Sequence, residues 1–152
     1  MNTFPQDKEK RLLELLEQEL ELFDRIREQT IAQAEMLEAE DTDGFDRALD
    51  VRQGTIEKIN GLHQEQNVLM QSYVSFSNAP DGTKIDAIEL AIGKIGALVE
   101  ECVRLNDLNI AEAKEKTEEY IKQIGKLSLR RKSLGKYALG VPNDPELFDR
   151  KT

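Results

Sequence analysis

Few side chains in this sequence could perform chemistry, and those few are scattered along it. The 152 residues include one histidine, His63, and one cysteine, Cys102. A nucleophilic dyad needs a base beside its nucleophile, and a zinc or di-iron site needs several nitrogen, sulfur or carboxylate ligands at fixed spacing. No such set, and no glycine-rich phosphate loop, can be assembled. We therefore expect no catalytic residue, no metal and no cofactor, and a protein that is not an enzyme.

The acidic stretch at residues 41–44 (DTDG) superficially resembles a calcium-binding EF-hand loop. Aligning Gly44 with the invariant glycine of that loop puts Ala39 at the first ligand position. Asp50 then stands where a bidentate glutamate is expected. An ordinary helix N-cap explains these residues better.

Charge is distributed unevenly along the chain. The formal net charge is -9, yet from Lys126 onward seven Lys or Arg stand against three acids, a local +4 that leaves -13 for the first 125 residues. Such an acidic protein is not expected to bind nucleic acid, because phosphate contacts need a basic face. The basic end suits an acidic protein or an anionic membrane, or it is simply a solvated helix terminus.

Apolar spacing predicts three helices, at about residues 6–40, 45–76 and 84–138, followed by a flexible tail at 140–152. The loops between them are short, so consecutive helices should run antiparallel. At about 1.5 Å per residue the third helix would be roughly 80 Å long, against roughly 50 Å for the others. The predicted fold is an all-α antiparallel three-helix bundle or coiled coil, in a single domain of residues 1–152, with the third helix extending beyond the first two.

The two halves of the third helix differ in composition. Its first half carries a dense apolar seam formed by Ile85, Ile88, Ile92, Ile95, Val99 and Cys102. Cys102 is expected to be a small buried hydrophobe there. Asn106 and Asn109 continue the seam, where they either fix register as buried polar groups or mark the place where the bundle opens. In the second half charge dominates, and the apolar side chains form a thin stripe without an obvious partner. These are the candidate partner-binding residues: Tyr120, Ile121, Ile124, Leu127, Leu134 and Tyr137.

The sequence also suggests a cellular location. The N-terminus becomes polar at once, which argues against a secretory signal. The richest apolar window, residues 85–103, is broken by charged residues, so no stable membrane insertion is expected. We expect a cytoplasmic protein.

Several features together resemble the FlgN-type flagellar export chaperones. They are the opening segment at residues 12–27 (LLELLEQELELFDRIR), the acidic loop before a second helix, the LNDLN run at 105–109, and the short tail after a long third helix. The resemblance covers nearly the whole chain.

This resemblance implies a cytoplasmic chaperone that binds the C-terminal helical segments of hook-filament junction proteins and delivers them to the type III export gate. In that family the end of the last helix captures the client, and a tyrosine near the C-terminus contributes to docking on the gate protein FlhA. Tyr120 and Tyr137 are both candidates for that tyrosine. Two alternatives remain open: a FliT-type chaperone of the filament cap protein, and a structural homodimeric coiled coil without a client.

Overall fold

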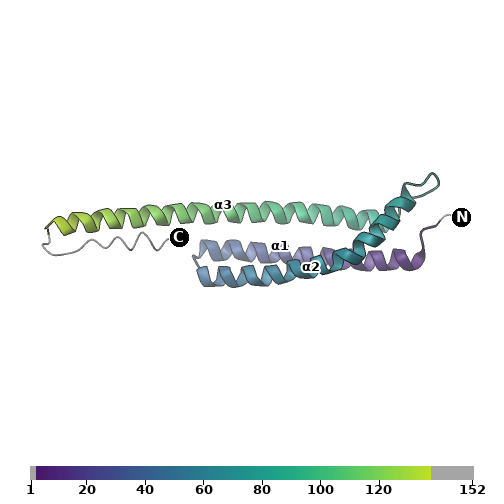
Figure 1. Cartoon of the computed structure of the whole chain (residues 1–152), viewed down its shortest axis with the longest axis horizontal. Coiled ribbons are helices and arrows are strands. Elements are labelled where there is room, and N and C mark those ends of the chain that lie inside the picture. The colour runs from purple at the N-terminus through teal and green to yellow at the C-terminus, as the bar shows by residue number, and fades with distance from the viewer. Residues whose placement is uncertain (1–2, 138–152) are drawn as a thin grey trace. The chain divides into compact units, whose positions relative to one another are not determined.

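The computed structural model describes residues 3–137, and their side chains as far as Ser133. This part of the chain is helical apart from short loops, with α1 at Gln6–Glu38, α2 at Thr42–Ser77 and α3 at Asp86–Tyr137 (Figure 1). The three helices form an all-α bundle in which consecutive helices run antiparallel. The predicted fold class is confirmed, and the predicted tail at 140–152 lies outside the described residues.

Local chemistry explains where the helices begin and end. α1 follows Pro5, and α2 begins at Thr42 because the Asp41 side chain accepts a hydrogen bond from the Gly44 backbone nitrogen at 2.9 Å. That N-cap starts α2 three residues earlier than the predicted position 45. Glu40, with φ of 57°, makes the sharp reversal after α1, which ends at Glu38 rather than at residue 40.

The loop between α2 and α3 is held by its backbone and by one tyrosine. The Gly82 nitrogen donates to the Ala79 oxygen at 2.9 Å, and a Cβ at Gly82 would lie 1.9 Å from the Phe76 oxygen, so only glycine fits there. The Tyr73 hydroxyl accepts a hydrogen bond from the Ile85 backbone nitrogen at 3.0 Å. This contact joins the end of α2 to the segment that leads into α3, whose helix begins at Asp86 rather than at residue 84.

Two apolar clusters hold the three helices together. The first contains the side chains of Leu12, Leu16, Tyr73 and Ile88, and Phe4 closes it with its ring centroid 5.6 Å from that of Tyr73. The second joins one residue from each helix: Ile26, Ile59 and Cys102. Five of the predicted seam residues of α3 belong to these clusters: Ile85, Ile88, Ile92, Ile95 and Cys102. Val99 instead lines an open hollow on α3.

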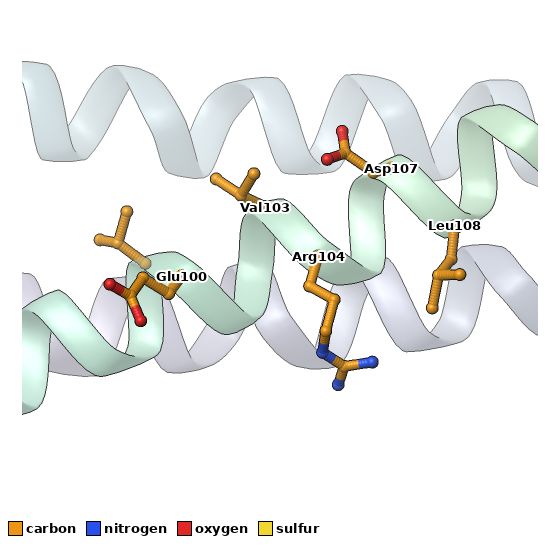
Figure 2. A pocket seen from close by; sticks show the side chains of 6 residues that line it. Glu100, Val103, Arg104, Asp107 and Leu108 are labelled. Carbon is orange, nitrogen blue, oxygen red and sulfur yellow. The ribbon is translucent and has the colours of Figure 1, made fainter.

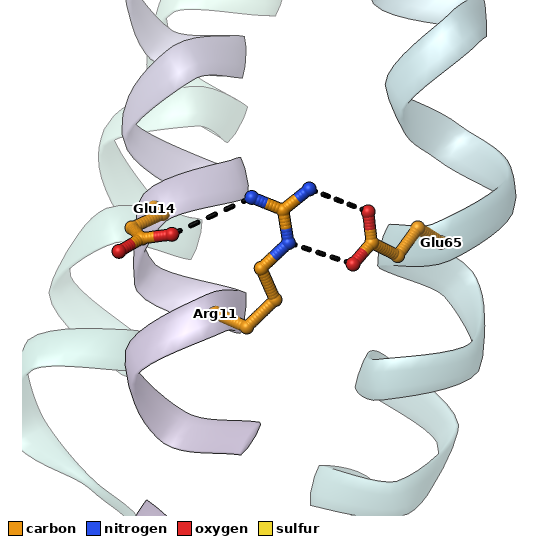
Figure 3. A network of polar contacts seen from close by, with 3 residues as sticks. All are labelled: Arg11, Glu14 and Glu65. Atoms are coloured by element: carbon orange, nitrogen blue, oxygen red, sulfur yellow. Dashed lines mark hydrogen bonds and ion pairs between the residues drawn. The ribbon is translucent and has the colours of Figure 1, made fainter. Parts of the chain in front are cut away.

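An exposed ion pair bridges α1 and α2 (Figure 3). The Arg11 guanidinium donates from Nε to one oxygen of Glu65 at 2.7 Å and from Nη2 to the other at 2.6 Å. Its Nη1 lies 3.4 Å from Glu14, on the same helix. The hydrogen bonds from Arg11 lower the pKa of Glu65 below its ordinary value. The two parallel hydrogen bonds join α1 to α2 at this point of the surface.

The chain divides into two compact units, Met1–Ile110 and Ala111–Thr152. The division falls within α3, which is helical without interruption through Asn109 and Ile110 to Tyr137. α3 has 52 residues, against 33 in α1 and 36 in α2, so the prediction of one unusually long helix is confirmed.

Candidate partner-binding surface

The predicted stripe belongs to the second unit, where residues 111–137 are helical. This segment is rich in good helix formers, and oppositely charged residues recur four apart, as in Glu118 and Lys122. The Thr117 hydroxyl donates to the Ala113 backbone oxygen at 2.8 Å, one turn earlier. Local sequence is therefore sufficient to explain a helix here.

Three of the predicted residues share one side of this helix. Steps of four and three residues keep Tyr120, Ile124 and Leu127 within about 60° of one another, since each residue turns the helix by about 100°. Tyr120 is 65% exposed and Leu127 is 64% exposed, while Ile124 is half-buried. Ile121 is 51% exposed and lies at the edge of this face. We call these four residues the apolar stripe.

The remaining two predicted residues are placed only by their backbone. Leu134 and Tyr137 lie within α3, and their side chains are outside the described part of the structure. Leu129 is 68% exposed, but it points away from the stripe, about half a turn from Tyr120. It is therefore not part of the same face.

Sequence reasoning missed a second surface, on α3 within the first unit. Six residues line a shallow open hollow there: Val99, Glu100, Val103, Arg104, Asp107 and Leu108. Val103 and Leu108 are each more than half exposed, and Figure 2 shows Val103 and Asp107 on one side of the helix and Arg104 and Leu108 on the other. The signal was present in the sequence as apolar residues one position away from the seam, at 103 and 108. The spacing of the seam does not include these two positions.

A layer of polar side chains crosses the first unit beside Cys102. Arg52 of α2 donates from Nη1 to Gln33 Oε1 at 2.8 Å and to Asn106 Oδ1 at 2.9 Å, and its Nη1 lies 3.4 Å from Thr30 Oγ1. Burial lowers the pKa of Arg52. No acid forms an ion pair with Arg52 among the described residues. We call Thr30, Gln33, Arg52 and Asn106 the polar layer.

His63 of α2 and Cys102 of α3 each contact a residue of α1. His63 Nε2 lies 3.1 Å from Glu19 Oε1, and Gln66 donates to the other oxygen of this buried carboxylate. Cys102 is 7% exposed, its sulfur lies 3.5 Å from the Phe23 oxygen, and burial raises the pKa of its thiol. A raised pKa is the opposite of what a nucleophilic cysteine requires.

Within residues 3–137, no group of three or more His, Cys, Asp or Glu could hold a metal ion. None of the helices described there is both long and apolar enough to cross a membrane.

No family model, curated protein or solved structure matches this chain significantly.

Proposed function

We propose that this protein is a non-catalytic export chaperone of the FlgN type. Its clients would be the C-terminal helical segments of flagellar hook-filament junction proteins, which it binds in the cytoplasm and delivers to the export gate protein FlhA. The observation that carries the proposal is the apolar stripe, which a helical client can cover.

The stripe has the form of a helix-binding surface. Anchors spaced by four and three residues, as at Tyr120, Ile124 and Leu127, meet the apolar face of another helix in the helix-in-groove mode of recognition. Contiguous exposed apolar side chains on a soluble protein often mark an interaction site. Tyr120 combines a large apolar ring with a hydroxyl, as residues at the centre of interfaces commonly do.

Docking on FlhA is the second part of the proposal, and it depends on a tyrosine. Tyr120 is exposed on the stripe, whereas the Tyr137 side chain is not described. If Tyr120 serves client capture, Tyr137 is left for the gate. Replacing each tyrosine by alanine and measuring client binding and FlhA binding separately would assign the two roles.

Calorimetry with the full-length protein and a C-terminal junction-protein peptide tests the proposal. We expect binding that Ile124→Asp weakens at least tenfold, because a charge would then lie beneath the client helix. Val68→Asp is the matched control, since Val68 is 66% exposed on α2 and lies outside the stripe. Absence of both heat and co-elution at concentrations on the order of tens of micromolar would refute the chaperone proposal.

The same assay separates the two alternatives. A peptide from the filament cap protein that binds in place of the junction peptide would identify a FliT-type chaperone. If the protein is a structural homodimer without a client, light scattering will show a stable dimer that neither peptide affects, and Ile124→Asp will dissociate it.

A further inference from the structure

The charges around the apolar stripe are segregated along the helix. Residues 111–119 contain four glutamates and two lysines, whereas residues 120–137 contain six Lys or Arg and no acid. Five of these cations have described side chains, and all five are exposed: Lys122, Lys126, Arg130, Arg131 and Lys132. The stripe therefore has a strongly basic end.

Three consecutive cations surround the stripe at that end. Counting about 100° per residue, Arg131 lies in line with Tyr120 and Ile124, while Arg130 and Lys132 follow on its two flanks. A helix lying along the stripe would reach Arg131 directly and would have Arg130 and Lys132 on its two sides. No hydrogen bond or ion pair joins the three to other residues within the described part of the chain.

A second copy of this helix would complement the basic end poorly. A parallel copy would bring Arg130 against its own counterpart, and like charges at an interface oppose association. An antiparallel copy would bring residues 111–119, in which the acids are interspersed with Lys114 and Lys116. A helix with acids and no lysines at the facing end fits better.

An anionic membrane surface is also a weaker match than an acidic helix. The first unit, residues 1–110, contains 23 acids against 11 Lys or Arg, a net -12. An anionic bilayer attracts the basic segment but repels this unit wherever it comes within about a Debye length of the surface. A single partner helix presents its acids only to the basic segment.

We infer that the stripe binds an amphipathic helix that carries acidic residues at the end facing Arg130, Arg131 and Lys132. The inference rests on the proposed function, because that function makes the client a helix. It adds the charge of the client and the direction in which the client lies on the stripe. The acids of the client select its orientation, because the opposite orientation would place them beside Glu118 and Glu119.

Fluorescence anisotropy with three synthetic helical peptides tests the inference on the full-length protein. The peptides share apolar residues at positions i, i+3, i+4 and i+7, and they carry glutamate, glutamine or lysine on the flanks of one end. We expect the glutamate peptide to bind roughly tenfold tighter than the glutamine peptide, since three exposed ion pairs each contribute modestly. The difference should vanish near 1 M salt, where the Debye length is about 3 Å.

Reversing the charges of Arg130, Arg131 and Lys132 provides a second and more specific test. The triple variant R130E/R131E/K132E should prefer the lysine peptide, whereas the control K10E/R47E/K58E should keep the preference for glutamate. The control residues are exposed in the first unit, and their substitution changes net charge by the same amount. Circular dichroism would establish that both variants stay helical, so that a changed preference reports on contact.

Several outcomes would overturn the inference. They are equal affinity for the glutamate and glutamine peptides, no binding of any of the three, an unchanged preference in R130E/R131E/K132E, and tighter binding to phosphatidylserine vesicles than to the glutamate peptide. Chain dimerisation that the glutamate peptide does not displace would also overturn it, in favour of a second copy. The junction-protein peptide, measured in parallel, reports on the proposed function separately, so either idea can fail while the other stands.

Discussion

Asn109 on α3 donates a hydrogen bond from its side-chain nitrogen to the backbone oxygen of Thr30 on α1, at 2.9 Å. Asn109 is 7% exposed and lies one residue before the end of the first unit. Thr30 also belongs to the polar layer around Arg52. Polar groups from three helices thus meet near the end of the first unit, where their hydrogen bonds favour one register of the helices.

Removal of the arginine from the polar layer should destabilise the first unit. Arg52→Met leaves Gln33 Oε1 and Asn106 Oδ1 without their donor, and a buried polar group left unpaired costs about 1–3 kcal/mol. We expect a fall of that size in the free energy of unfolding, measured with urea. Arg47→Met is the matched control, because Arg47 is exposed on the same helix. Equal stability of the two variants would show that Arg52 is not needed to satisfy the layer.

The polar layer shows what the sequence could and could not predict. Apolar spacing predicts the positions of the helices and places Asn106 and Asn109 on the seam of α3. Arg52, however, interrupts the apolar pattern of α2, and its partner Asn106 lies 54 residues away in sequence. Their meeting depends on how two helices are rotated against each other, which spacing within one helix does not determine. The stripe was predictable for the opposite reason, because it needs only the periodicity of one helix.

The core seam of α3 can be tested with two neighbouring aliphatic residues. Ile88 is fully buried in the first cluster, whereas Leu90 is 61% exposed two positions later. Ile88→Ala should lower the free energy of unfolding by about 2–5 kcal/mol, through lost burial and the cavity that remains. Leu90→Ala should change it by no more than about 0.5 kcal/mol. Comparable losses in both variants would mean that the assigned face of α3 is wrong.

Acid should weaken the contact between α1 and α2 through Glu65. Because Arg11 holds the pKa of Glu65 below its ordinary value, the folded state favours the ionised carboxyl. The resulting stabilisation is complete above the unfolded pKa of glutamate, about 4.3, and is lost as the pH falls through the lower folded value. The difference in unfolding free energy between wild type and Glu65→Gln should therefore be larger at pH 7 than at pH 3.

Glu57→Gln serves as the control for that experiment. Glu57 is an exposed glutamate on the same helix, and it forms no ion pair with any residue of the described bundle. The difference in unfolding free energy between wild type and Glu57→Gln should depend much less on pH. Added salt should reduce the loss of unfolding free energy in Glu65→Gln, because the Arg11 and Glu65 side chains are both exposed and their attraction is screened. A Glu65→Gln difference that stays constant between pH 3 and pH 7 would contradict the assigned cause of the pKa shift.

The thiol of Cys102 should react slowly in the folded protein. Burial raises the pKa of Cys102, and the negative charge of Glu101 raises it further, so less thiolate is present at any given pH. The thiolate is the reactive species, and a 7% exposed side chain is also poorly accessible to reagent. We expect labelling by a disulfide reagent at pH 8 to be at least roughly tenfold slower in buffer than in denaturing urea. Equal rates would show that α3 separates from α1 and α2 near Cys102 faster than the reagent reacts, since a closed bundle cannot admit it.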